Sequence, residues 1–112
     1  MTLIINLICS ATEQIVPDFL FKIVDPKDWQ ESASLENLKL ASVDSEFIHF
    51  STEEQLERIL TKYWSDRAYV LLKVDTTQLP GEMKFETNQG GAAKYYHLYN
   101  GAIPLKAVTI VK

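Results

Sequence analysis

Short segments in which apolar and polar residues alternate recur along this chain, and such alternation is typical of half-buried β-strands. The clearest is 82–87, where Met83 and Phe85 are expected to face inward and Lys84 and Glu86 to face the other way. Other segments are rich in β-branched and aromatic residues and are bounded by turn residues. The segments that we expect to be strands are 19–24, 38–42, 47–51, 68–75, 82–87, 95–99 and 107–111.

Two segments have the spacing and end signals of helices. Asp25 followed by proline is a favourable helix start, because the aspartate caps free N–H groups and proline at the first position loses no hydrogen bond. This first helix is expected to reach about residue 33. Thr52 with Gln55 forms a capping-box pattern ahead of a second helix that is expected to end near Trp64. The apolar positions of the second helix lie three and four apart, at Leu56, Ile59, Leu60 and Tyr63.

The order of these elements predicts an α+β fold, with two main helices packed on mixed or antiparallel sheets. The most continuous apolar run, 68–75, is expected to be a central strand. A chain of 112 residues is long enough for one hydrophobic core and too short for two. We therefore expect one small domain at residues 18–112. Residues 1–17 are expected to be an N-terminal extension or an extra strand.

Composition and charge narrow the classes of partner. The chain is 46% hydrophobic and 23% charged, which is ordinary for a globular domain. Its net charge of -4 and scattered basic residues argue against nucleic-acid binding, which needs clustered lysine and arginine. The apolar N-terminus has no basic flank and is too short to span a membrane, so no membrane partner is expected. Cys9 is the only cysteine, which fits a cytoplasmic location. The sequence leaves the oligomeric state open.

The candidate chemistry lies mainly in two histidines, His49 and His97, each on a predicted strand among aromatic residues. Side-chain alternation places His49 and Ser51 on one face. Two histidines are too few for a closed zinc site unless Cys9 or Glu86 joins them, and no metal site is predicted. Glu86 can be read as a surface carboxylate or as an acid in a pocket. The histidines themselves can serve packing rather than ligand binding.

Several of these features occur together in a fixed order: Trp29, then Phe47-Ile48-His49-x-Ser51-Thr52-x-x-Gln55, then Glu86, Gly90-Gly91 and His97-Leu98-Tyr99. In this combination the chain resembles the small bacterial family known as domain of unknown function 952, over about residues 19–111. It departs from that family at Glu46, where glycine is usual, and at Tyr95-Tyr96, where Phe-Pro is usual.

The resemblance implies a fold similar to the ADP-ribosyltransferase superfamily, in which compact sheets surround a cleft for NAD. It implies that His49 hydrogen-bonds the ribose and that Ser51 or Thr52 supports the sugar or the strand. Tyr95 or Tyr99 would stack on the nicotinamide ring. NAD or a related small-molecule nucleotide is therefore the expected ligand, with NAD as a substrate.

The resemblance also implies two catalytic candidates, Glu86 and His97, which would act on the ribose. The chain would then be a glycosyltransferase of the ADP-ribosyltransferase type and would transfer ADP-ribose. The alternative is a non-enzymatic module that binds a small ligand or another protein and in which the histidines are structural. The sequence does not decide between an enzyme and such a module.

Overall fold

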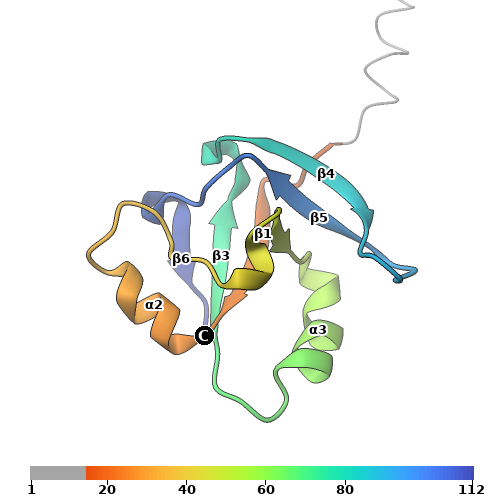
Figure 1. Ribbon diagram of the computed structural model, residues 1–112, viewed down its shortest axis with the longest axis horizontal. Helices are drawn as coiled ribbons and strands as arrows, with labels where there is room; N and C mark the ends of the chain where they lie inside the picture. Colours follow the sequence, from red (N-terminus) through yellow and green to blue (C-terminus); the bar gives the residue numbers. More distant parts are fainter. Residues whose placement is uncertain (1–14) are drawn as a thin grey trace, which may run out of the picture.

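The computed structural model describes residues 15–112 and contains two antiparallel sheets of three strands each (Figure 1). The first sheet has the order β1-β3-β6, with β1 at Phe19–Val24, β3 at Val70–Asp75 and β6 at Val108–Ile110. The second has the order β2-β5-β4, with β2 at Ile48–Phe50, β5 at Lys94–Tyr99 and β4 at Glu82–Thr87. A single bridge between Phe21 and Ser51 joins them, with backbone N···O distances of 2.8 and 2.9 Å.

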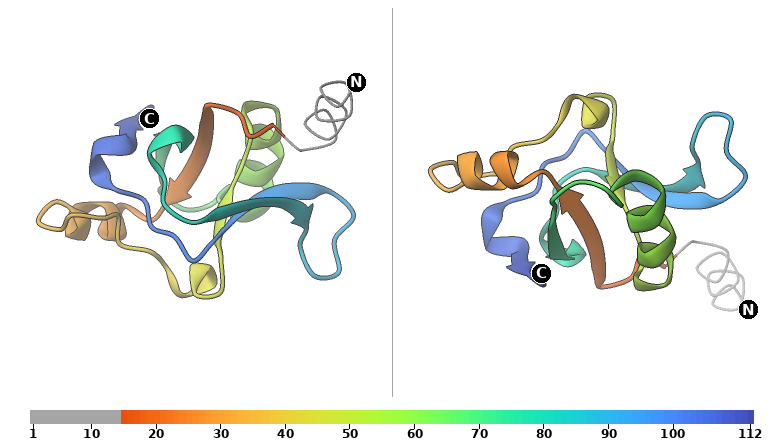
Figure 2. Two further views of the ribbon diagram at one scale, coloured as in Figure 1. Left: turned by 90° about the horizontal axis from the view of Figure 1, so that it is seen from above. Right: turned by 90° about the horizontal axis from the view of Figure 1, so that it is seen from below.

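The two helices lie at opposite sides of the molecule (Figures 1 and 2). α2 spans Pro26–Ser32 and begins where the Asp25 side chain accepts a hydrogen bond from the backbone of Lys27. α3 spans Leu56–Tyr63 and continues directly from a short 3-10 turn at Glu53–Gln55. Three further 3-10 turns connect the strands, at Ser42–Asp44, Thr76–Gln78 and Leu105–Ala107.

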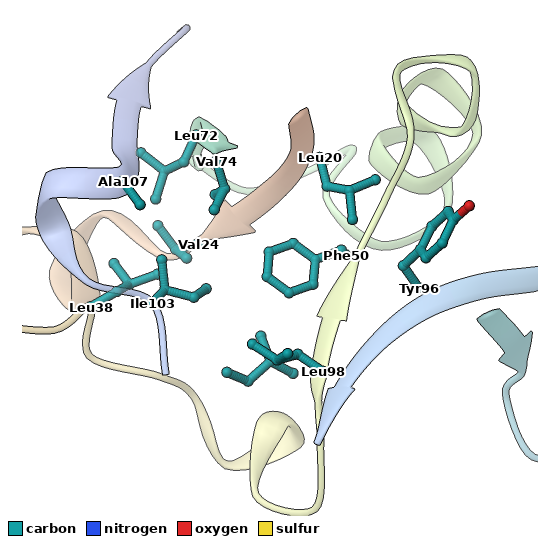
Figure 3. Close-up of a cluster of buried hydrophobic side chains, with 11 residues drawn as sticks. Leu20, Val24, Leu38, Phe50, Leu72, Val74, Tyr96, Leu98, Ile103 and Ala107 are labelled. Atoms are coloured by element: carbon teal, nitrogen blue, oxygen red, sulfur yellow. The ribbon is translucent and has the colours of Figure 1, made fainter. Parts of the chain in front are cut away.

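Both sheets contribute to one hydrophobic core. Figure 3 shows Phe50 of β2 in the middle of this core, between Leu98 of β5 and the side chains of the first sheet. The alternation of each strand explains the arrangement, because every second side chain points to the same face. The buried apolar residues of the cluster are Leu20, Val24, Leu38, Ile48, Phe50, Leu72, Val74, Tyr96, Leu98, Ile103 and Ala107.

Most of the expected elements are confirmed. β1 and β4 have the predicted bounds, β3 is central in its sheet, and both helices form where their end signals indicated. Every strand pair is antiparallel, so the mixed alternative does not apply to the described residues. The predicted extra strand near the N-terminus lies outside the described residues.

The prediction of a strand at 38–42 is wrong. Only an isolated bridge between Asn37 and Pro104 forms there. The backbone N–H of Leu38 donates to the carbonyl of Ile103, and the N–H of Lys39 donates to Ser32 Oγ, at 2.8 Å each. These two N–H groups thus bond to a connecting segment and to a side chain, and the segment pairs with no strand of either sheet. The sequence alternation reflected one buried residue, Leu38, rather than a sheet position.

Candidate functional site

One face of the β2-β5-β4 sheet points into the core, and the other carries most of the predicted site residues. Ile48, Phe50, Tyr96 and Leu98 alternate onto the core face. The opposite face carries the histidines and Glu86, because these residues occupy the intervening positions. His97 is paired in register with His49 on one side and with Lys84 on the other. Strand pairing therefore brings two histidines that are far apart in sequence into direct contact, with ring centroids 5.3 Å apart.

A cleft of about 990 Å³ lies against this polar face. Its walls come from β1, from the segment leading into β2, from α3 and from the β4-β5 hairpin. Of the predicted site residues, five line it: His49, Ser51, Glu86, Tyr95 and Tyr99. Thr52 and His97 do not. The size and the mixture of aromatic and polar walls suit a small organic ligand.

Glu86 lines the cleft together with a second carboxylate, Glu46, and two neighbours hold Glu86 in place. The Tyr99 hydroxyl donates to Glu86 Oε2, and His97 Nδ1 lies 2.8 Å from the same oxygen. The hydrogen bond from Tyr99, followed by the contact with His97, lowers the pKa of Glu86 below its ordinary value. The same bond raises the pKa of Tyr99 to about 12. Glu86 is therefore ionised at neutral pH, and among the described residues no hydrogen bond occupies its other oxygen, Oε1.

His97 lies below the cleft rather than on its wall. Its side chain is fully buried, and the Phe47 ring stacks on it at a centroid distance of 4.1 Å. Phe47 itself lines the cleft and also lies beside His49 and Tyr99. Within residues 15–112, His97 Nε2 is buried without a hydrogen-bond partner. In this geometry His97 contacts Glu86 and cannot reach a ligand unless Phe47 moves.

His49 is held by a buried carboxylate, Asp44. Asp44 Oδ1 accepts from the backbone N–H of His49 at 3.0 Å and lies 2.9 Å from its ring Nδ1. Lys22 Nζ contacts the same carboxylate, 3.0 Å from Oδ1 and 2.9 Å from Oδ2. Burial alone would raise the pKa of Asp44, but the bonds from His49 and the Lys22 ammonium outweigh it and lower the pKa below its ordinary value. The imidazole of His49 is about one third exposed, toward the cleft.

The two hydroxyl candidates have different surroundings. Ser51 is buried at the bridge between the two sheets and lines the cleft. Thr52 forms the predicted capping box with Gln55, whose side chain accepts from the Thr52 backbone N–H at 3.0 Å. The position of Thr52 thus accounts for the start of the following turn and helix.

At the α3 end of the cleft, Arg67 lies over the ring of Trp64, with its guanidinium carbon 4.0 Å from the ring centroid. One guanidinium nitrogen donates to Asp25 at 3.1 Å, and both side chains of this ion pair are more than 40% exposed. Because Lys22 is already paired with Asp44, Arg67 is the cation of the described cleft wall that solvent can reach.

A family model described as "Protein of unknown function (DUF952)" matches residues 23–111. The chain belongs to this family. A crystal structure of the protein CC0527 from Caulobacter crescentus is similar to this DUF952 chain, with a TM-score of 0.68, 30% identity and 81% of each chain covered. A double-mutant form of CC0527 gives a TM-score of 0.67 at 24% identity, over 84% of this chain and 86% of that one. No curated protein matches.

These neighbours support the small α+β fold of the DUF952 chain. In the part of the chain that the structure describes, no helix has the length and apolar character needed to cross a membrane. The same residues contain no cluster of three or more His, Cys, Asp or Glu side chains suited to a metal ion.

Sequence reasoning missed Lys22, Asp44 and Arg67 as members of the site in this DUF952 chain. The signal for Lys22 was present: period-two alternation puts it on the same face of β1 as Leu20 and Val24, both of which are core residues. A lysine at an inward strand position requires a buried partner. Asp44 carried no such signal, because it lies in a turn between predicted elements, and a charged residue in a turn is normally expected to be exposed.

Proposed function

We propose that this DUF952 domain binds NAD or a related ribosyl nucleotide in the cleft and transfers ADP-ribose from it. NAD is the ligand that the resemblance to the ADP-ribosyltransferase superfamily implies, and ADP-ribose transfer is the reaction that it implies. The observation that carries it is an ionised carboxylate, Glu86, that shares one cleft wall with an anchored imidazole, His49, and with aromatic rings.

Glu86 suits the charge that this reaction develops. Breaking the bond between nicotinamide and ribose builds positive charge on the sugar, and a fixed carboxylate nearby stabilises it. Tyr99 and His97 hold Glu86 through Oε2, which leaves Oε1 for the ligand. His97 then acts on the reaction through Glu86, as a positioning residue.

Ribose and nicotinamide find matching groups on neighbouring strands. The ring of His49 offers one nitrogen to a ribose hydroxyl, because Asp44 occupies the other. Tyr95 and Tyr99 line the cleft with Glu86, and a tyrosine ring there suits stacking by the nicotinamide ring. Ser51 places a hydroxyl at the same wall.

The phosphates of the nucleotide are assigned to the Arg67 end of the cleft. Glu53 and Glu54 occupy the first turn before α3, and their charges disfavour an anion at that helix start. Arg67 follows α3 at its other end, and its planar group can bond phosphate oxygens in pairs. In this proposal the phosphates lie at Arg67 and the ribose lies at the wall that carries Glu86 and His49.

NMR titration with NAD tests the proposal. We expect shift changes at cleft residues that saturate below millimolar NAD, and a weaker response for His49→Ala. The matched pair Glu86→Gln and Glu82→Gln isolates the carboxylate, because both residues lie on the same face of β4 and only Glu86 lines the cleft. Release of nicotinamide should fall with the first variant and not with the second. An absence of response to millimolar NAD would exclude the proposal.

A non-enzymatic module with structural histidines is the second candidate. The observation that favours it is the complete burial of His97 under Phe47. In that case His49→Ala would lower the melting temperature while leaving any ligand affinity unchanged. Thermal denaturation of the same variant that is used in the titration therefore separates the two candidates.

A further inference from the structure

The Lys22–Asp44 ion pair occupies an unusual position, since both residues are less than 10% exposed. Lys22 projects from the core side of β1 between Leu20 and Val24. Taking two charges out of water has a large desolvation penalty, and apolar residues of similar size commonly stabilise such a site as well or better. Fold stability therefore does not account for the pair, and its contact with His49 at the cleft suggests a role in the site.

Asp44 fixes the proton of the His49 ring. A carboxylate only accepts hydrogen bonds, so the Nδ1 atom that lies 2.9 Å from Asp44 Oδ1 must carry the hydrogen. The same oxygen accepts from the backbone N–H of His49, which sets the direction from which the ring is held. In the neutral ring the second nitrogen, Nε2, is then an acceptor with no hydrogen of its own.

Lys22 allows the Asp44 carboxylate to lie close to the cleft without repelling an anionic ligand. Its ammonium contacts both oxygens of Asp44, at 3.0 and 2.9 Å, and balances the charge of the carboxylate. The carboxylate can thus orient His49 without adding a net negative charge below the cleft. An unpaired carboxylate there would repel the phosphates of a nucleotide.

We propose that Asp44 and Lys22 are positioning residues that present His49 Nε2 as a hydrogen-bond acceptor, and that this selects ligands with a donor, such as a ribose hydroxyl, at that point. The inference deepens the proposed function and rests on it for the ligand, but not for the state of the ring. A phosphate or carbonyl oxygen, which only accepts, is disfavoured at His49. The site therefore binds the sugar at His49 and the phosphates at another point of the cleft.

The first test uses the free wild-type protein. The 15N shifts of the two ring nitrogens distinguish the Nδ1–H from the Nε2–H form, and the His49 signals are assigned by their loss in His49→Ala. We expect the Nδ1–H form. An Nε2–H form or a mixture of the two would overturn the inference, whatever the outcome with NAD.

The second test uses the double variant Lys22→Met, Asp44→Asn. It keeps the side-chain volumes and leaves no buried charge, so the fold is expected to persist. Asparagine offers both a donor and an acceptor, so it no longer fixes the ring, and we expect a mixture of the two forms. The control Asp66→Asn removes an exposed carboxylate that does not line the cleft. A double variant that keeps a pure Nδ1–H form would overturn the positioning role.

The affinities for two ligands then test whether His49 selects for a hydroxyl group on the ribose. NAD is compared with the analogue that lacks the 2′-hydroxyl of the nicotinamide ribose. The wild type should prefer NAD by about tenfold or more, because the analogue leaves Nε2 unpaired. The double variant should lose most of this preference. Equal binding of both probes by the wild type would overturn the selection, whereas binding of neither would reject the proposed function and leave the ring-state result standing.

Discussion

Replacement of Asp44 by alanine gives the sharpest test of the energetics of the site. The variant removes the partner of a buried ammonium, since the side chain of Lys22 is only 6% exposed. It also removes the acceptor of two hydrogen bonds from His49, one from the ring and one from the backbone. The ammonium of Lys22 is then left buried without its counter-charge. Unfolding of the domain should therefore become much easier.

The magnitude follows from the burial of the pair. Removing one partner of a buried ion pair costs about 3–5 kcal/mol in the free energy of unfolding. A domain of this size has about 5–15 kcal/mol in total, so the loss is a large fraction. At roughly 4–8 °C per kcal/mol, the melting temperature should fall by more than about 10 °C. The double variant Lys22→Met, Asp44→Asn should stay within about 1 kcal/mol of the wild type, because no charge is left unpaired.

Urea denaturation followed by circular dichroism measures both variants, with Asp66→Ala as an exposed control that is expected to change stability by less than about 0.5 kcal/mol. A cycle built from Lys22→Met, Asp44→Asn and the double variant gives the coupling between the two residues. The reasoning is refuted if Asp44→Ala costs less than about 1 kcal/mol, or if the double variant is as unstable as Asp44→Ala.

Three further predictions concern the cleft and its supports. In an absorbance titration compared with Tyr99→Phe, one tyrosine should ionise near pH 12, and Glu86→Gln should bring this pKa back toward 10.0. Because the folded pKa of Tyr99 is the higher one, its stabilising contribution is complete below pH 10 and is lost as the pH rises through about 12. Gly101→Ala should cost about 1–3 kcal/mol in urea denaturation, since a Cβ there would lie 2.3 Å from a backbone carbonyl oxygen, whereas Gly90→Asn, with nothing within 4 Å and a positive φ that asparagine tolerates, should change little. Arg67→Ala should lower the affinity for NAD, measured by calorimetry, more than the affinity for nicotinamide riboside, which has no phosphate. The melting temperature should change little, because the ion pair of Arg67 is exposed. An equal loss of affinity for both ligands would contradict the phosphate assignment.

Much of the site could be predicted because it depends on strand alternation. The pattern of 82–87 placed Glu86 opposite the core residues Met83 and Phe85, and the structure has them so. The same rule put His49 and Ser51 together, and both line the cleft. Such predictions succeed because the direction of a side chain on a strand depends only on its neighbours in sequence.

The remainder depended on tertiary contacts that no local pattern contains. Asp44 meets Lys22 across 22 positions of sequence, and the position of the turn that carries Asp44 is set by the whole fold. His97 lies in β5 and is buried because the Phe47 ring packs on it. Phe47 comes from another part of the chain, directly before β2. Strand alternation could place His49 and Ser51 on one face, but it did not predict that Phe47 would cover His97.

The wall formed by α3 has a consequence of its own. None of the residues of α3 is buried, so the helix contributes little to the core, while Ile59 and Tyr63 of α3, and Trp64 directly after it, line the cleft. In this respect α3 differs from Lys22 and Asp44, whose buried ion pair bears on both stability and the cleft. On the proposed function, exchanging the side chains of Ile59, Tyr63 and Trp64 should alter ligand affinity at little cost in stability. A library randomised at these positions is the natural place to look for new specificities.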